Sequence, residues 1–245
     1  MAGGAVTYKG IILKSREYKD KDRIISFLTG DHGLVDICVK GTGKIGSHNA
    51  FASVPYMLCE IVAAESHGFM YMRSGSIIES NSKIHSDLDA LMCGAHFADL
   101  LVDMSGQSDN SREAYELACY TYYHLANNTV RWKLITAAFN WRVLSILGFT
   151  VEYAVTNDTG SSVTDNDLYC LSANGGEIYS GKHSGEQYMM LSGVAVKALN
   201  YIAACDIKEL YGITGSESLS DSLFEFTLKY LSYQLDKDYK GRFMI

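Results

Sequence analysis

The stretch "GIILKSREYKDKDRIISFLTGDHGLVDICVKGTGKIGS", residues 10–47, alternates apolar and β-branched runs with short polar turns. Turns such as "TGDHG" contain the glycine and aspartate residues that commonly end a strand and reverse the chain. Two further runs of the same kind follow before residue 80. The pattern therefore predicts five strands: Val6–Lys14, Arg23–Leu28, Leu34–Lys40, Tyr56–Ala63 and Phe69–Glu79.

Five short strands in a segment of this length are typical of a small barrel. The five-stranded Greek-key barrel called the OB-fold fits the length, and it binds oligonucleotides through one face and its connecting loops. We therefore predict an α+β multidomain protein whose N-terminal domain, residues 1–80, is a five-stranded OB-fold barrel.

The apolar residues change from a strand period to a helical period at Ile84. Ser86 and Asp89 have the spacing of a capping box, which places a helix start there. Helices are predicted over residues 84–104, 112–127, 130–147, 194–204 and 219–235, and they form a domain over residues 81–245. The helix over 130–147 is apolar almost all round, so we expect it at the centre of the helical core, ended by Gly148 as a C-cap glycine.

Helical periodicity is lost from residue 156 to 186, where serine, asparagine, aspartate and glycine dominate. Two pieces, "DLYCLS" and "GEIYS", are weakly strand-like. We predict a small irregular insertion in the helical domain over residues 156–190.

The composition indicates a soluble globular protein, since no uninterrupted apolar run approaches the ~18 residues of a membrane helix. The N-terminal residues "MAGGAVTYKG" lack the basic and apolar regions of a signal peptide, so we expect no export and no membrane association. The 6 cysteines are scattered without a C-x-x-C pair, which is typical of buried thiols in a reducing cytoplasm.

The glycine-rich loop "VKGTGKIGSHN", Val39–Asn49, is not a P-loop. Ile45 stands where the motif needs serine or threonine, and Cys38 stands where it needs the first glycine. The motifs G-x-S-x-G, H-E-x-x-H and the EF-hand loop are absent as well. Cys93 and His96 have the spacing of two metal ligands on one helix face, but no second pair accompanies them. We therefore predict no catalytic residue, no metal site and no cofactor.

Charge is distributed unevenly along a chain whose net charge is −7. Residues 1–83 hold ten lysines and arginines against eight acids, whereas residues 84–245 hold eleven against twenty. Binding of a polyanion therefore belongs to the first part. The predicted nucleic-acid-binding residues are Lys14, Arg16, Lys19, Lys21, Arg23, Lys40, Lys44 and Arg73. Interleaved aromatic residues offer faces for base stacking: Tyr8, Tyr18, Phe51, Tyr56, Phe69 and Tyr71. The alternative is an ordinary solvated surface, because acids alternate with these bases.

Taken in order, these segments resemble the RecO family of bacterial recombination mediators. Residues 10–47 are similar to the family's N-terminal signature, and "PYMLCEI", "LSILGF" and "LFEFTLKYLSYQLDKDYKGRF" agree with its later parts. The resemblance implies a non-catalytic, nucleoid-associated cytoplasmic protein that binds and anneals single-stranded DNA. It also implies association with RecR, binding of the acidic, apolar-ended tail of single-stranded DNA-binding protein, and help in loading RecA.

One departure concerns zinc, because many RecO proteins carry a four-cysteine zinc module after the core helix. The corresponding insertion here contains only Cys170, and one thiol cannot complete a tetrahedral site. We therefore expect a degenerate zinc-ribbon-like insertion that lacks zinc ligands.

The second part of the chain offers few cations for binding an acidic tail. Arg131, Lys133 and Arg142 form the densest cluster, and we predict that they bind this partner. Alternatively, Arg142 lays its aliphatic stem along a packed helix and keeps only its head in water.

Two functions from other classes remain open. A protein-interaction scaffold with little direct DNA binding would suit the acidic helical domain. A metal-dependent enzyme is the other, and metal analysis of the purified protein would test it.

Overall fold

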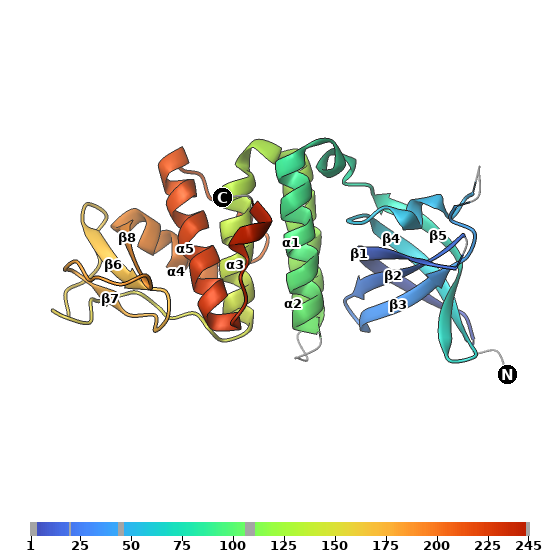
Figure 1. Ribbon diagram of the computed structural model, residues 1–245, viewed down its shortest axis with the longest axis horizontal. Helices are drawn as coiled ribbons and strands as arrows, with labels where there is room; N and C mark the ends of the chain where they lie inside the picture. The colour runs from blue at the N-terminus through green and yellow to red at the C-terminus, as the bar shows by residue number, and fades with distance from the viewer. Residues whose placement is uncertain (1–3, 20, 44–46, 106–110, 244–245) are drawn as a thin grey trace. The chain divides into compact units, whose positions relative to one another are not determined.

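The computed structural model describes residues 4–19, 21–43, 47–105 and 111–243 (Figure 1). The chain divides into two compact units, residues 1–129 and 130–245. Among the helices of these described ranges, none combines the length and the apolar character needed to cross a membrane.

The first unit contains a closed barrel with the strand order β1-β2-β3-β5-β4. All neighbouring strands are antiparallel except β3 and β5. The strands are β1 (Val6–Tyr18), β2 (Asp22–Thr29), β3 (Gly33–Val39), β4 (Leu58–Ser66) and β5 (Phe69–Glu79). The predicted five-stranded barrel is confirmed, although β1 runs on to Tyr18 and β4 begins at Leu58 rather than at Tyr56.

The alternation of apolar and polar residues in each strand places one set of side chains inside the barrel. A short 3₁₀ helix, η1 (Ala50–Ser53), adds Ala52 to this core. The buried core residues are Ile12, Ile25, Phe27, Ile37, Val39, Ala52, Met57, Cys59, Ile61, Ala63 and Met72. Gly10 is required where β1 meets β2, since a side chain there would lie 2.5 Å from the Leu28 carbonyl oxygen.

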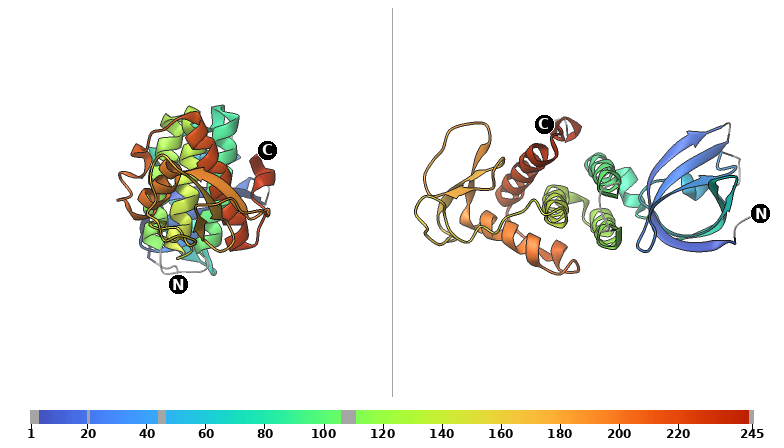
Figure 2. Two further views of the ribbon diagram at one scale, coloured as in Figure 1. Left: turned by 90° about the vertical axis from the view of Figure 1, so that its left-hand side faces the viewer. Right: turned by 90° about the horizontal axis from the view of Figure 1, so that it is seen from below.

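Two helices, α1 (Leu88–Ser105) and α2 (Ser111–Asn127), follow a 3₁₀ turn, η2 (Ser82–Ser86), and stand beside the barrel (Figure 2). The predicted capping box is wrong. Asp87, in an extended conformation, accepts a hydrogen bond from the Ala90 amide at 2.9 Å, whereas the Ser86 hydroxyl donates to the Lys83 carbonyl. Asp87 takes the N-cap position because Ser86 still belongs to the preceding turn.

Tyr56 connects the barrel to the helix pair. Its ring is stacked on Tyr122 of α2 at 5.0 Å and on His85 at 5.4 Å, and the residue is 5% exposed. Gly94 of α1 lets the ring approach, because a side chain there would come within 2.9 Å of it. The Tyr122 hydroxyl then donates to the Gly94 carbonyl at 3.0 Å.

The second unit is built on α3 (Trp132–Ile146), which packs against α4 (Gly193–Ala204) and α5 (Glu217–Leu235). Trp141 is fully buried, and its ring centroid lies 4.9 Å from that of Tyr230. The central position predicted for this helix is therefore confirmed. Gly148 follows in a left-handed conformation, with φ of 79°, and its amide donates to Ser145, which confirms the predicted C-cap. Three 3₁₀ turns complete the described elements: η3 (Thr129–Arg131), η4 (Leu210–Gly212) and η5 (Lys240–Phe243).

The insertion forms a three-stranded sheet in the order β7-β6-β8. The two strand-like pieces of the sequence are β6 (Leu168–Ser172) and β7 (Ile178–Tyr179). The third strand, β8 (Tyr188–Ser192), was not predicted, because it is short and runs directly into α4.

The insertion does not fit a zinc module. Its one cysteine, Cys170, is buried in β6, and no group of three or more His, Cys, Asp or Glu among the described residues could hold a metal ion. Hydrogen bonds join its two loops instead. The Asn157 amide donates to the Ile178 carbonyl at 2.7 Å, and the Ser180 amide and hydroxyl donate to the Asp158 carboxylate at 3.1 and 2.6 Å.

These hydrogen bonds predict a pH-dependent contribution of Asp158 to stability. The Ser180 hydroxyl is the main cause that holds the pKa of Asp158 far below its usual range. A depressed pKa in the folded state means that the stabilisation is fully present above the unfolded pKa of about 3.9 and is lost as the pH falls below it. Asp158→Asn should therefore lower the melting temperature at neutral pH, and the difference from wild type should shrink on acidification.

Glu152→Gln, an exposed charge change in the same insertion, is the control for Asp158→Asn and should melt like wild type.

The melting temperature of the wild-type protein should not change when a metal chelator is added. A chelator-induced drop, or stoichiometric zinc in the purified protein, would contradict the metal-free insertion.

Candidate nucleic-acid interface

Two loops come together at one end of the barrel. One is the turn from β1 to β2, and the other follows β3. The Gly43 amide and the Thr42 hydroxyl both donate to the Lys21 carbonyl at 3.3 Å, and the Gly41 amide donates to the Asp22 carboxylate at 2.9 Å. Gly41 has φ of 70°, a conformation that favours glycine. The two loops therefore form one continuous surface.

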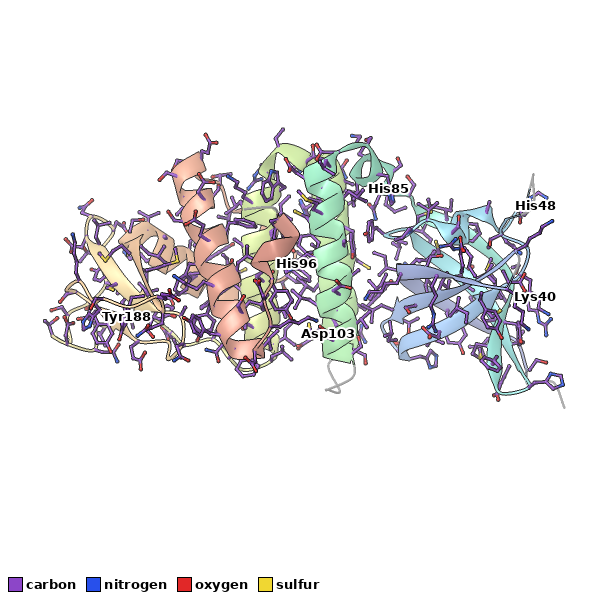
Figure 3. The ribbon with its side chains drawn as sticks, viewed as in Figure 1. Lys40, His48, His85, His96, Asp103 and Tyr188 are labelled. Atoms are coloured by element: carbon purple, nitrogen blue, oxygen red, sulfur yellow. The ribbon has the colours of Figure 1, made fainter. Side chains whose placement is uncertain are left out.

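This surface carries four exposed cations, which we call the rim: Lys19, Lys21, Lys40 and Arg73. Lys40 lies beside β5, because Cys38 is opposite Tyr71 and the Lys40 ammonium is 4.8 Å from the Tyr71 ring centroid. Arg73 follows Tyr71 by two residues on β5. Figure 3 labels Lys40 and His48 at this end of the barrel. No described carboxylate lies within 4.0 Å of the four side-chain charges.

Two half-exposed tyrosines lie among the rim cations. The ammonium of Lys19 is 5.1 Å from the ring centroid of Tyr18, and that of Lys40 is 4.8 Å from the ring centroid of Tyr71. Rings beside unpaired cations are the combination with which proteins stack bases and follow the phosphates of a single strand. Of the other predicted stacking residues, Phe51 and Tyr56 pack in or against the interior, and Tyr8 packs on His32.

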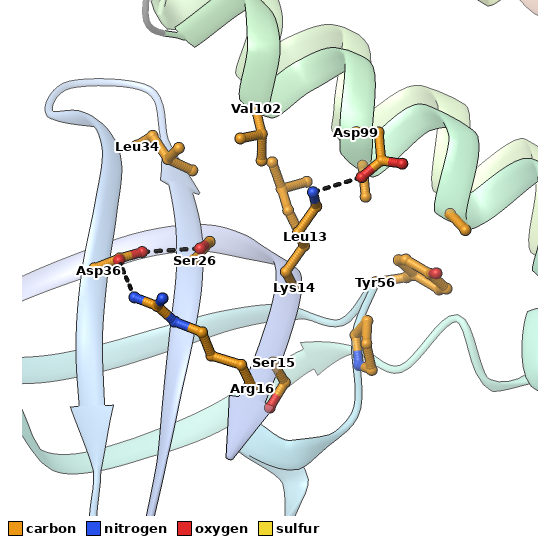
Figure 4. Close-up of a pocket in the computed structure, with 13 residues that line it drawn as sticks. Leu13, Lys14, Ser15, Arg16, Ser26, Leu34, Asp36, Tyr56, Asp99 and Val102 are labelled. Carbon is orange, nitrogen blue, oxygen red and sulfur yellow. Dashed lines mark hydrogen bonds and ion pairs between the residues drawn. The ribbon is translucent and has the colours of Figure 1, made fainter. Parts of the chain in front are cut away.

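Three other predicted cations are engaged by acids or by the barrel itself. Lys14 pairs with Asp99 of α1 at 2.5 Å, and Arg16 pairs with Asp36 of β3 at 3.0 Å. Both pairs lie in a cleft of about 720 Å³ between the outer face of β1–β3 and α1 (Figure 4). Arg23 donates to the Ser15 hydroxyl and carbonyl and lies 3.7 Å from Glu17. Lys44 lies outside the described residues.

The two groups of cations differ in what they offer a polyanion. The rim charges are exposed and have no described acidic partner, whereas a phosphate would have to displace Asp99 or Asp36 to reach Lys14 or Arg16. Exposed ion pairs contribute little free energy, so breaking one would weaken phosphate binding only slightly. The barrel cations without a described acidic partner are therefore gathered mainly at the rim.

The predicted cluster on α3 separates into two places. Arg131 and Lys133 line a pocket of about 640 Å³, together with Trp132, Thr214 and Glu217. Val130, which is 91% exposed, stands at the same pocket. The site therefore combines apolar surface with two cations.

Both pocket cations are already positioned by neighbours. The Arg131 guanidinium donates to the Ile213 carbonyl, and the Lys133 ammonium donates to the Asp221 carboxylate. This hydrogen bond with Asp221 raises the pKa of Lys133, so the ammonium stays charged at neutral pH.

Arg142 lies away from this pocket, about 16 Å beyond Arg131 along the helix axis at 1.5 Å per residue. Its guanidinium donates to the carbonyls of Ala203 and Cys205 at the end of α4. These carbonyls lack helical partners, and a cation also suits the negative end of the helix dipole. Arg142 thus caps the C-terminal end of α4 and does not line the pocket.

The model described as Recombination protein O N terminal matches residues 1–81, and that described as Recombination protein O C terminal matches residues 85–243. The chain belongs to the RecO family. It is a RecO-family DNA repair protein, with the barrel and rim in the first matched region and the α3 pocket in the second.

Curated RecO proteins match nearly the whole chain. The DNA repair protein RecO of Acetivibrio thermocellus is 25% identical over 230 residues, which cover 94% of this chain and 92% of the relative. That of Caldicellulosiruptor bescii is 23% identical over 232 residues, covering 95% and 94%. The family models meet between residues 81 and 85, whereas α1 and α2 belong to the same compact unit as the barrel. A domain boundary at residue 80 stays a prediction.

The acidic partners of the cations could not be identified from the sequence. Asp99 and Asp221 lie far along the chain from Lys14 and Lys133, and no local spacing relates them. The pocket residues Thr214 to Ser220 were missed for the same reason.

The rim predicts a modest salt dependence of binding to single-stranded DNA. Each neutralised phosphate contributes ~0.7 to the slope of log K against log salt, so that three to five contacts give about −2 to −3.5. Replacing Lys19, Lys40 and Arg73 together by alanine should flatten the slope by about 2.

The matched control replaces Lys14, Arg16 and Arg23 by alanine, which changes the net charge by the same amount. It should change the slope less, because these cations are already engaged. Fluorescence anisotropy of a labelled oligonucleotide at several salt concentrations measures both slopes. Equal slopes for the two triple variants would remove the rim as the contact surface.

Proposed function

We propose that this chain is a recombination mediator that binds and anneals single-stranded DNA. In this role it helps to load RecA, together with RecR, on DNA covered by single-stranded DNA-binding protein. The observation that carries the proposal is the rim, where unpaired cations and two tyrosine rings meet at one end of a barrel. The roles of RecR and RecA rest on the family resemblance alone. A non-catalytic, cytoplasmic and nucleoid-associated protein is part of the same proposal.

Annealing of two complementary oligonucleotides, one with a fluorophore and one with a quencher, tests the proposal. The wild-type protein should accelerate quenching by neutralising phosphate repulsion between the strands. The rim triple variant should lose most of the acceleration, and the Lys14, Arg16 and Arg23 triple variant should keep more of it. A wild-type protein that binds partners but neither binds nor anneals DNA would favour the protein-interaction scaffold. The pairing of Lys14 and Arg16 with acids supports that alternative.

The pocket at the start of α3 is proposed to bind the tail of single-stranded DNA-binding protein. An acidic tail with an apolar end needs apolar surface beside cations, and Val130, Trp132, Arg131 and Lys133 provide both. Because Lys133 forms an ion pair with Asp221, the tail carboxylates would compete with Asp221 for the ammonium group.

Titration of a fluorescent tail peptide tests this assignment. Arg131→Glu and Lys133→Glu should each weaken binding roughly ten- to a hundredfold, as for loss of a charge-assisted contact worth ~1.5–3 kcal/mol. Lys197→Glu, an equal charge change on α4, and Arg142→Gln should bind nearly like wild type once circular dichroism shows that they are folded. If both pocket variants bind the peptide like wild type, the tail site lies elsewhere.

A further inference from the structure

One face of the insertion sheet is buried, and the other is partly covered, since Cys170 and Ser172 on it are only 1% and 3% exposed. Tyr169, Leu171, Ile178 and Leu191 point to the buried side. α4 and α5 lie to one side of this sheet in the ribbon views (Figures 1 and 2). On the opposite side Leu168 is 62% and Met190 is 39% exposed. Apolar residues on a solvent-facing sheet surface are typical of a contact surface for another molecule.

Three aromatic rings gather on this open side. The ring of His183 lies 4.0 Å from that of Tyr179 and 5.3 Å from that of Tyr188, and the two tyrosine rings are 6.2 Å apart. Tyr179 and Tyr188 are half-buried and His183 is exposed. Tyr188 is labelled on this sheet in Figure 3. We call Leu168, Tyr179, His183, Tyr188 and Met190 the insertion face.

The surroundings of the insertion face are strongly acidic. Residues 150–192 contain six acids and one lysine, Lys182. Two carboxylates lie near Tyr179, since Asp158 accepts hydrogen bonds from the next residue, Ser180, and Glu177 is two residues before it. Desolvation and then the charges of these carboxylates raise the pKa of Tyr179. Asp158 is held ionised by its hydrogen bonds with Ser180. A phosphate backbone would be repelled here, whereas a cation would be attracted by both the carboxylates and the aromatic rings.

We propose that the insertion face is a docking surface for a cationic, arginine- or lysine-bearing segment of a partner protein. A guanidinium or ammonium group over a tyrosine ring is attracted by the ring quadrupole, and neighbouring carboxylates add charge complementarity. Met190 and Leu168 supply apolar contact for the aliphatic stems of the same side chains. The insertion face is separate in sequence from the rim, so this inference does not rest on DNA binding.

The test uses the full chain and two fluorescein-labelled probe peptides, one of alternating arginine and glycine and one with glutamate in place of arginine. The wild-type protein should bind the arginine peptide and not the glutamate peptide. Tyr188→Ala should weaken arginine-peptide binding about two- to fivefold, the value of one exposed cation–π contact. Tyr188→Phe should keep it because the ring remains. Met190→Lys, a change at an exposed position that adds a like charge, should weaken it too.

Glu177→Gln and Glu209→Gln separate a specific surface from bulk charge. Both remove one acid, but Glu209 follows the far end of α4, which is about 18 Å long, so only Glu177→Gln should weaken binding. The inference is overturned if Tyr188→Ala and Met190→Lys bind the arginine peptide like wild type, or if Glu209→Gln has the same effect as Glu177→Gln. It is also overturned if Tyr188→Ala reduces binding of single-stranded DNA, since the face would then take nucleic acid. Failure of this test leaves the salt slope of the rim unchanged.

Discussion

The stack of Tyr56 on Tyr122 is the interaction on which the first unit depends. Tyr56 has a left-handed backbone, with φ of 70°, and its amide donates to the Ile12 carbonyl at 2.6 Å while its carbonyl accepts from Asn81 at 2.8 Å. These two hydrogen bonds hold the Tyr56 backbone on the barrel, and its ring contacts the helices. Burial raises the pKa of Tyr56 to about 12, so the ring stays neutral in the interface. Because α1 is held in this position, Asp99 reaches Lys14 and the cleft beside the barrel exists.

Pairing of charges, rather than their number, distinguishes the surfaces of this protein. In the barrel, Lys14, Arg16 and Arg23 lie near acids, whereas the four rim cations have no described acidic partner. A polyanion would therefore be attracted to a small area of an otherwise acidic chain. In the second unit, the same principle gives Lys133 an internal acid that an external tail would have to replace.

Hydrogen bonds hold the two loops of the insertion together. In a zinc module the ion joins two loops through four thiolates. Here hydrogen bonds of Asn157, Asp158 and Ser180 join the two loops. One face of the sheet is buried. Such hydrogen bonds are individually weaker than metal ligation, and those from Ser180 hold the pKa of Asp158 far below its usual range. The acidity and the aromatic face are thus features that this chain combines at one surface.

The sequence alone predicts the five strands and the central helix with its glycine cap, and it shows a single cysteine in the insertion. Each follows from a local pattern: alternation, helical period, a glycine after the last turn, or the count of cysteines. The folded structure was needed to show which cations are paired, that Arg142 caps the end of α4, and that Tyr188–Ser192 forms a third strand. Those features depend on residues distant in sequence that folding brings within a few ångströms, and no local period encodes such distances.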